Sequence, residues 1–295
     1  RRVLFRSEVG ACRDEAERQS LIASGWGDRL DTQFMSRDLA SGDNIVFAWR
    51  SFEAYPGLVL IAGATPVQVP LLTDATHDLA AMAAAVTERT RVVIVCSPNN
   101  PTGTFVDGAT LAAFLKKIPS SVVVVLDEAY TEYLAPAQRY DSLAWTREYP
   151  NLLISRTFSK AYGLAGLRVG FGIAQPALTD LLNRIRQPFN VNSLAQAAAV
   201  AALGDDAYLQ KSAKLNADGY RQLTAAFEAM GIEYVRSSGN FVLFRAGSDD
   251  AAGARVNLAL LRRGIIVRPV GNYGLPQWLR VSIGLPHENA AFIDA

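Results

Sequence analysis

The chain has 295 residues, of which 50% are hydrophobic and 19% are charged, and its formal net charge is +1. This is the composition of a globular protein with a large core, and a charge so near zero gives no reason to expect nucleic acid or an anionic membrane as a partner. Cys12 and Cys96 form no C-x-x-C pair, which argues against a disulfide framework or a metal site and favours a reducing cytoplasm. No apolar run approaches the ~18 residues of a membrane span, and no signal-peptide pattern opens the chain. We therefore expect no targeting segment and a small-molecule partner.

Residues 1–38 differ in composition from the rest, because 14 of these 38 residues are charged. The stretch RDEAERQSLIASGWG predicts a short charged helix that ends at Gly25. No strand and no phosphate-binding loop is evident in this part. We therefore treat residues 1–38 as an atypical N-terminal segment.

From about Asp43 onward, short runs rich in β-branched residues alternate with helical ones. Strands are predicted for NIVFAW, TPVQVP, RVVIVC, VVVVLD and NLLIS, and helices for HDLAAMAAAVTER and DGATLAAFLKKI between them. This alternation predicts an α/β fold in which helices cover both faces of a mostly parallel sheet. We assign residues 39–205 to this large domain.

The pattern changes near residue 206. VNSLAQAAAVAAL predicts a buried, alanine-rich helix capped by Ser193, and the next helix runs from Asp206 until Gly231 stops it. The strands NFVLFR, GIIVRP and LRVSIG then flank the helix ARVNLALLRRG. Residues 206–295 are therefore predicted to form a small α+β domain.

The stretch SRTFSKAYGLAGLRVGF places Lys160 and Arg168 in a run that is otherwise largely apolar. A lysine is strongly hydrated, so burying it among apolar side chains is costly unless its amine is neutralised or used covalently. Two interpretations remain open at this point. Lys160 either begins a surface helix, or it forms a covalent bond with a carbonyl group beside an anion site.

VVVVLDEAY places Asp127 at the carboxyl end of a buried strand, where open α/β sheets bind ligands. A Walker B strand would give the same pattern, but the chain has no Gly-Lys pair for a P-loop. An aspartate that caps a helix remains an alternative. CSPNNPTGT follows another such strand, and its Asn99 and Asn100 form either a simple turn or part of a site.

Together these residue types suggest pyridoxal 5'-phosphate as the cofactor. Lys160 would bind its aldehyde covalently, and Asp127 would keep the pyridine nitrogen protonated, so that the ring withdraws electrons from the carbon that loses a proton. Tyr130 and Asn100 could bond the ring hydroxyl. A fork of fixed donors suits a phosphate, and we expect the phosphate to be bound by Arg168, Ser159 and Thr157. Lys160, Asp127 and Tyr130 are the expected catalytic residues, and no metal is expected.

Seven motifs, in this order, resemble the histidinol-phosphate aminotransferases among the fold-type I pyridoxal-phosphate enzymes: SPNNPTG, DEAYTEY, RTFSKAYGLAGLRVGF, RQPFNVNSLAQAAA, GNFVLF, GIIVRP and LRVSIG. The resemblance runs from about Ala40 to the end of the chain. It implies a seven-stranded large domain that holds the cofactor and a small domain. It also implies a homodimer with active sites at the subunit interface.

The resemblance further implies roles for matching positions. Phe52 falls where an aromatic ring stacks on the cofactor, and Arg280 falls where an arginine binds the acidic end of the substrate. Asn100 is assigned to the substrate site as well as to the cofactor. Arg268 resembles a second arginine that helps to hold the phosphate of histidinol phosphate. The alternative for either arginine is an exposed side chain with no such role.

The N-terminal segment departs from this resemblance. Family members begin with an arm whose tyrosine reaches into the partner's active site, and with a glycine-rich loop that binds the cofactor phosphate. Residues 1–38 match neither feature, although GWGD at residues 25–28 lies near the place expected for the loop. We therefore expect an incomplete or aberrant N-terminus and, for the chain as written, poor activity.

The implied reaction moves an amino group between L-histidinol phosphate and 2-oxoglutarate in histidine biosynthesis. An aminotransferase for phenylalanine or tyrosine would share the cofactor residues and differ in the substrate pocket. Lyases and decarboxylases of the same fold share Lys160 and Asp127, but Arg280 favours a substrate that keeps its acidic group. A non-catalytic cofactor-binding module, such as the sensing half of a transcription regulator, is disfavoured because no DNA-binding helical domain precedes the fold.

Overall fold

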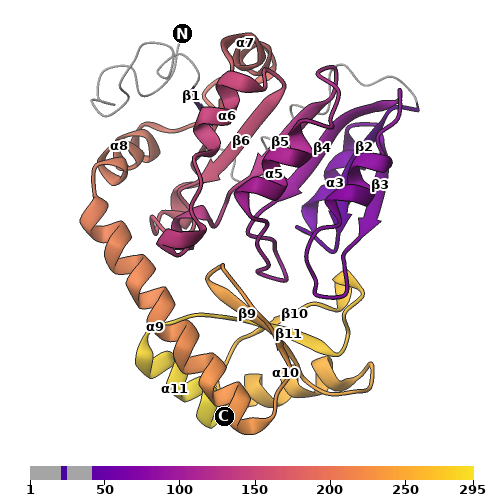
Figure 1. Cartoon of the computed structure of the whole chain (residues 1–295). Helices are drawn as coiled ribbons and strands as arrows, with labels where there is room; N and C mark the ends of the chain where they lie inside the picture. Colours follow the sequence, from indigo (N-terminus) through magenta and orange to yellow (C-terminus); the bar gives the residue numbers. More distant parts are fainter. Residues whose placement is uncertain (1–20, 25–41) are drawn as a thin grey trace.

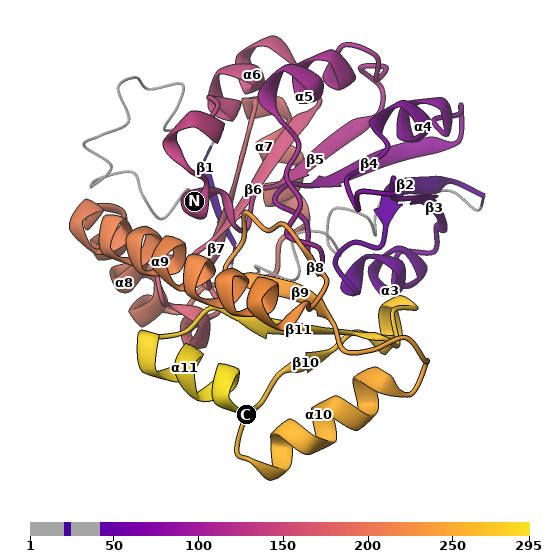
Figure 2. The ribbon, with the colours of Figure 1, turned by 60° about the horizontal axis from the view of Figure 1, so that its bottom comes forward.

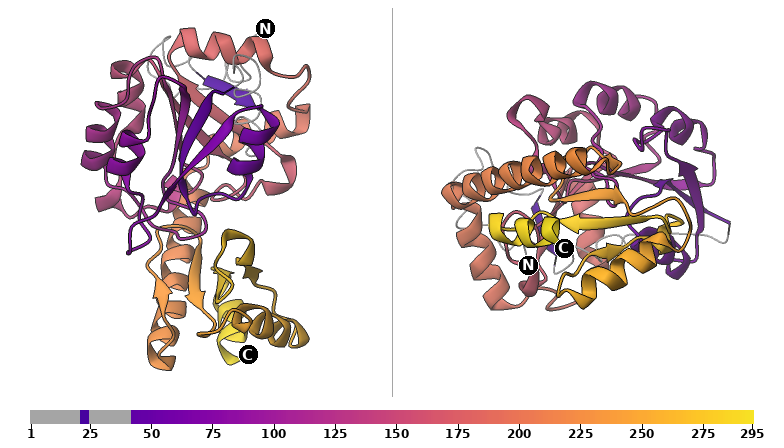
Figure 3. Two further views of the ribbon diagram at one scale, coloured as in Figure 1. Left: turned by 90° about the vertical axis from the view of Figure 1, so that its right-hand side faces the viewer. Right: turned by 90° about the horizontal axis from the view of Figure 1, so that it is seen from below.

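The structure, a computed structural model, describes residues 21–24 and 42–295. It contains a larger unit built on a seven-stranded sheet and a smaller unit built on a four-stranded sheet (Figure 1). The long helix α9, Asp206–Met230, runs from the larger unit to the smaller one. The smaller unit lies below the larger unit in the left view of Figure 3. The α/β fold predicted from the alternating pattern is confirmed.

The larger sheet is mostly parallel, and its strands lie in the order β1-β7-β6-β5-β4-β2-β3. Strands β2 to β6 pair in parallel, whereas β7 pairs antiparallel with both β6 and β1. The carboxyl ends of the parallel strands therefore meet at one edge, which is where such sheets bind ligands. The seven strands are Leu21–Ser24, Asn44–Trp49, Thr65–Pro70, Thr90–Cys96, Val123–Asp127, Leu152–Thr157 and Gly170–Ala174.

Strand β1 corrects the prediction for the N-terminal segment. Residues Leu21–Ser24 form an edge strand that pairs with β7, whereas the sequence pattern indicated a helix through this stretch. Four residues carry too little periodicity to identify a strand, and pairing with β7 overrides the local helix preference. The rest of the predicted helix and the GWGD stretch lie outside the described residues.

Alternate residues of the central strands enter two hydrophobic cores, one on each face of the sheet. In β4, Val93 and Val95 belong to the core beneath α4, α5 and α8, whereas Val92 and Ile94 belong to the core beneath α3 and α7. Figure 2 shows α4, α5 and α6 on one side of the sheet. Burial on both faces explains the nearly unbroken apolar runs. The covering helices, α3 to α8, are Ala54–Ile61, Leu79–Ala84, Gly108–Leu115, Ser142–Glu148, Pro176–Ile185 and Ser193–Leu203.

Helix α8 differs in two respects from its prediction. Its cap is Asn192, whose side-chain oxygen accepts a hydrogen bond from the Ala195 amide at 2.9 Å, and Ser193 is the first helical residue. The helix is also less buried than its alanine content suggested, because Leu194 is 76% exposed. Both asparagine and serine are favoured caps, so the sequence alone could not decide between neighbouring positions.

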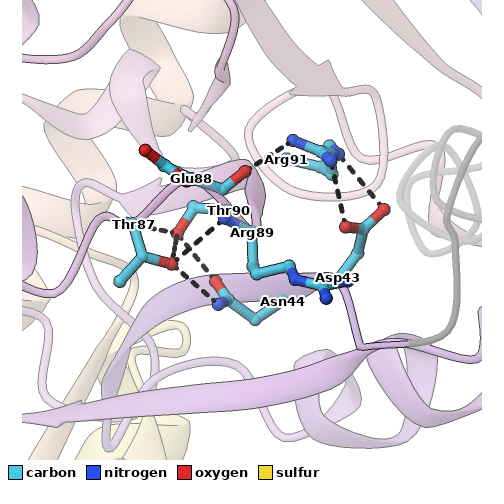
Figure 4. A network of polar contacts seen from close by, with 7 residues as sticks. All are labelled: Asp43, Asn44, Thr87, Glu88, Arg89, Thr90 and Arg91. Atoms are coloured by element: carbon cyan, nitrogen blue, oxygen red, sulfur yellow. Dashed lines mark hydrogen bonds and ion pairs between the residues drawn. The ribbon is translucent and has the colours of Figure 1, made fainter.

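A polar network aligns strands β2 and β4 at the edge opposite to their carboxyl ends (Figure 4). Arg91 at the start of β4 contacts both carboxylate oxygens of the buried Asp43, each at 3.1 Å. Asn44 accepts from the Thr90 hydroxyl at 2.8 Å and donates to the Thr87 hydroxyl at 3.3 Å. These bonds fix the register of the two strands and therefore the relative positions of the loops at their other ends.

The smaller sheet is antiparallel throughout, in the order β10-β11-β9-β8. Its strands are Tyr234–Val235, Phe241–Arg245, Arg268–Pro269 and Trp278–Ser282, with α10, Ala252–Arg262, and α11, Pro286–Asp294, packed beside them. The strand predicted for GIIVRP is reduced to its last two residues, since only these pair with β11. None of the described helices combines the length and apolar character needed to cross a membrane. The predicted domain boundary at residue 206 stays a prediction.

Candidate active site

All ten residues predicted for the site line one cavity of about 290 Å³. They are Phe52, Asn100, Asp127, Tyr130, Thr157, Ser159, Lys160, Arg168, Arg268 and Arg280. Most follow the carboxyl ends of the parallel strands, and the last two come from the smaller sheet, so the cavity lies between the two sheets. A larger cleft of about 860 Å³ is lined by none of the ten.

Asp127 ends the buried strand β5 with both carboxylate oxygens held by the chain. Its Oδ2 accepts a hydrogen bond from the Tyr55 hydroxyl at 2.6 Å, and its Oδ1 accepts from the Ala129 amide at 3.2 Å. Burial raises the pKa of Asp127, while the Tyr55 hydroxyl, the Ala129 amide and the nearby Lys160 ammonium lower it. The strand is followed by the 3₁₀ turn Thr131–Tyr133, capped by Tyr130, so the helix-cap alternative for Asp127 is wrong.

Tyr130 forms the wall between Asp127 and the smaller sheet. It is 4% exposed, and its ring packs edge-on against Phe241 with the centroids 5.2 Å apart. The ammonium Nζ of Lys160 lies 5.5 Å from the centroid of the Tyr130 ring. Burial raises the pKa of Tyr130, partly offset by Arg280, so its hydroxyl stays protonated and can donate.

Lys160 lies in a turn after β6 and begins no helix, which excludes the surface-helix interpretation. Its side chain is exposed, so the expectation of a lysine buried among apolar groups is wrong. Arg168 follows on the same loop in the left-handed region, with φ 54°. It donates to the Ser159 hydroxyl at 3.4 Å, and the Thr157 hydroxyl accepts from the Ser159 amide at 3.0 Å. One cation and two hydroxyls are therefore grouped in a way that suits an anion.

The two asparagines after β4 have different tasks. Asn99 is fully buried and structural: its Oδ1 accepts from the Ser51 hydroxyl at 2.7 Å, and its Nδ2 donates to the Arg50 carbonyl at 2.9 Å. Asn100 lines the cavity, and its Oδ1 accepts from Nη1 of Arg280. The CSPNNPTG stretch is thus both a turn and part of the site.

Arg268 and Arg280 are register partners in the β10–β11 pair, so their side chains lie on the same face. The guanidinium of Arg280 lies 4.6 Å from the centroid of the Phe241 ring, and its buried Nε has no partner among the described residues. Arg268 donates Nη2 to Glu53 at 2.6 Å. Any anion bound by Arg268 must therefore share it with Glu53, whereas Arg280 keeps an unused donor.

This set of groups fits the cofactor expected from the sequence. The carboxylate of Asp127 could accept from a pyridinium N–H, and the amine of Lys160 is within the same cavity. The Arg168 cluster could hold a phosphate, while the unpartnered Nε of Arg280 could bind a further acidic group. The cavity can therefore take a phosphorylated pyridine together with an anionic substrate.

Sequence reasoning missed three further residues that line or support the cavity. Glu53 pairs with Arg268, Tyr273 lines the cavity beside it, and Tyr55 bonds Asp127. Burial raises the pKa of Tyr273 to about 12, with Glu53 adding to this effect and Arg280 opposing it. The side chains that these residues meet are distant in sequence, so no local pattern could have identified the contacts.

Comparison with known proteins agrees with the geometry. The sequence model of aminotransferase class I and II matches residues 4–293, so the similarity begins well before Ala40, which was the expected start of the resemblance. Histidinol-phosphate aminotransferase 2 of Ralstonia nicotianae is 67% identical over 278 residues, which are 94% of this chain and 74% of that protein. Histidinol-phosphate aminotransferase 1 of Cupriavidus pinatubonensis is 66% identical over 86% of this chain and 67% of its own length.

Among solved structures, histidinol-phosphate aminotransferase from Sinorhizobium meliloti in complex with pyridoxal-5'-phosphate has a TM-score of 0.88 at 28% identity. This similarity covers 94% of our chain and 75% of that protein. A putative histidinol-phosphate aminotransferase from Erwinia carotovora atroseptica has a TM-score of 0.82 at 26% identity and covers 94% and 80% of the two chains. The sequence match spans nearly the whole chain, and the fold and cavity agree with it. The chain belongs to the class I and II aminotransferase family.

Proposed function

We propose that this protein is a pyridoxal 5'-phosphate-dependent transaminase that moves an amino group between L-histidinol phosphate and 2-oxoglutarate in histidine biosynthesis. The observation that supports this most directly is that ten residues from separate motifs line one cavity. Relatives that are 67% and 66% identical carry the name histidinol-phosphate aminotransferase. Membership of the aminotransferase family supports the reaction class, and the names of these relatives support the choice of substrate.

The bound cofactor supplies a ring that withdraws electrons from the substrate carbon that loses its proton. Lys160 Nζ is the basic group that would take the cofactor covalently and then accept and return that proton. Asp127 would hold a proton on the ring nitrogen, since its carboxylate is already oriented by two donors. Tyr130 and Asn100 would donate to the ring hydroxyl, and Phe52 would exclude water from one face of the ring.

The acidic end of the substrate would be bound by arginines. Arg280 has a buried and unpartnered Nε, and its Nη1 is held by Asn100, so its fork is oriented before an anion arrives. Arg268 would add a second fork for a phosphate, which has enough oxygens to engage both. The cofactor's own phosphate would be held separately, by Arg168, Ser159 and Thr157.

We further propose a homodimer in the cytoplasm. Lys160 and Arg168 are exposed in the single chain although they line the cavity, so a partner subunit would complete the enclosure of the site. Phe189 is 99% exposed and Leu194 is 76% exposed, which is unusual for large apolar side chains so close in sequence unless another surface covers them. Sedimentation or light scattering that gives only monomers at micromolar concentration would contradict this part.

The substrate is tested by initial rates with histidinol phosphate and with phenylalanine, each with 2-oxoglutarate. We expect the larger kcat/KM for histidinol phosphate, and a preference for phenylalanine would favour an aromatic aminotransferase. Cofactor attachment is tested separately, by borohydride reduction and peptide mass mapping. The label should be on Lys160, and a label on Lys116 or Lys211 instead would refute the proposed cofactor site.

The two arginines can be separated by one differential measurement. Arg268→Ala should reduce kcat/KM more for histidinol phosphate than for phenylalanine, because the phosphate dianion can bind two guanidinium groups, whereas the carboxylate of phenylalanine needs only one. Arg280→Ala is the matched comparison and should reduce both. Equal losses on Arg268→Ala would indicate a structural arginine that merely pairs with Glu53.

A further inference from the structure

Tyr55 is a buried tyrosine whose hydroxyl is directed at the carboxylate of the site. It lies in the first turn of α3, is 0% exposed, and its hydroxyl is 2.6 Å from Asp127 Oδ2. Its ring packs edge-on against Phe47 and Phe52, with centroid distances of 5.9 and 5.6 Å. The phenol therefore has little freedom to move away from Asp127.

The carboxylate of Asp127 is held in one orientation by two donors from different parts of the chain. Tyr55 contacts one oxygen, and the Ala129 amide, two residues beyond Asp127, contacts the other. The Ala129 amide belongs to the backbone just after β5, whereas the hydrogen bond from Tyr55 comes from a side chain and can be removed by substitution. A phenol suits this task, because it remains protonated at neutral pH and always donates.

We propose that Tyr55 is a positioning residue that holds the Asp127 carboxylate toward the ring nitrogen of the cofactor. This inference rests on the proposed function, since it assumes that pyridoxal phosphate occupies the cavity. Tyr55 itself does not line the cavity, so its effect on the cofactor would be transmitted by Asp127. Tyr55 also packs against Phe52, which does line the cavity. The orientation of the Asp127 carboxylate is therefore coupled to the position of the Phe52 ring.

The Tyr55→Phe substitution removes only the hydroxyl and keeps the aromatic packing. We expect the Kd of the apoenzyme for pyridoxal phosphate, measured by quenching of its tryptophan fluorescence, to rise about tenfold to a hundredfold, as for the loss of a hydrogen bond to a charged group. Tyr234→Phe is the matched control. Its hydroxyl also donates to a carboxylate at 2.6 Å, that of Glu228, but outside the cavity, so the Kd should not change.

Two measurements separate positioning from a general structural role. The first uses 1-deazapyridoxal phosphate, in which carbon replaces the ring nitrogen; Tyr55→Phe should leave its Kd unchanged within about twofold. The second repeats Tyr55→Phe in an Asp127→Asn background, where its effect on the Kd should largely disappear because the two changes act on one contact.

Several results would overturn the inference. Equal weakening of both cofactors, or the full effect persisting beside Asp127→Asn, would show that Tyr55 only supports the fold. An unchanged Kd in Tyr55→Phe, with a weakened Kd in Asp127→Asn, would refute the role of Tyr55 and leave the proposed function intact. No saturable binding by the unmodified apoenzyme would refute both.

Discussion

The half-buried side chain of Glu132 predicts a specific dependence of stability on pH. Glu132 lines a cleft of about 320 Å³ with Arg156, Arg139, Tyr162 and Asp206 among its neighbours. Its pKa is raised from 4.5 to about 7, because burial, with a smaller contribution from Glu128, outweighs the lowering effect of Arg156 and Arg139. Its Oε1 is buried and has no hydrogen-bond partner among the described residues.

The sign follows from the raised pKa. Below pH 4.5 Glu132 is protonated in both the folded and the unfolded chain, and between pH 4.5 and about 7 only the folded chain keeps the proton. The stability contributed by this group is therefore complete at acid pH and is lost as the pH rises to about 7. The raised pKa corresponds to roughly 3 kcal/mol at neutral pH and above.

Glu132→Gln removes this titration and keeps the shape of the side chain. We expect the variant to be more stable than the parent at pH 8, by up to roughly 3 kcal/mol, and the difference to shrink toward zero near pH 5. Urea unfolding of the apoenzyme of both proteins, at four pH values between 5 and 8, measures this difference in the free energy of unfolding. Replacement of the exposed Glu88 by Gln is the control for the substitution itself, and it should change the free energy of unfolding by no more than about 0.5 kcal/mol. A difference that does not vary with pH, or a Gln variant that is less stable at pH 8, would refute the reasoning.

Four further substitutions test other parts of the structure. With the cofactor at saturating concentration, Asp127→Asn should slow transamination by several powers of ten, at ~1.4 kcal/mol each, because an amide cannot hold the pyridinium proton. Near-normal single-turnover rates would contradict this. Arg156→Leu should lower the free energy of unfolding by about 3–5 kcal/mol, because the buried Glu128 would lose the two hydrogen bonds at 2.8 and 2.9 Å that it now accepts from Arg156. A decrease of less than about 1 kcal/mol, measured by urea unfolding, would show that the two side chains are not coupled. Gly253→Ala should lower the melting temperature, because its Cβ would lie 2.3 Å from a backbone carbonyl oxygen. Gly57→Ala in α3 has open space around its Cβ and should raise stability by about 0.5–1 kcal/mol. Equal changes in the melting temperatures of the two variants, measured by calorimetry, would contradict the packing argument.

The strands and most helices were predictable because each carries its pattern locally. The run VVVVLD identified β5 since burial on both faces requires an unbroken apolar stretch, and Gly231 ended α9 as predicted, with φ 67°. The residues predicted for the site lie together in one cavity, because Lys160, Asp127 and Asn100 stand at strand ends that a parallel sheet brings to one edge. The residues that line this cavity could therefore be chosen from short stretches of chain.

Only the tertiary structure decided which side chains support that chemistry. Tyr55 meets Asp127 across 72 positions and Glu53 meets Arg268 across 215, and neither pair leaves a periodic or spacing signal in the sequence. Strand β1 was missed for the same reason, since its conformation depends on pairing with β7 and not on its own four residues. Local sequence fixes backbone preference and polarity, whereas contacts between distant segments depend on how the layers pack, and packing is a property of the whole chain.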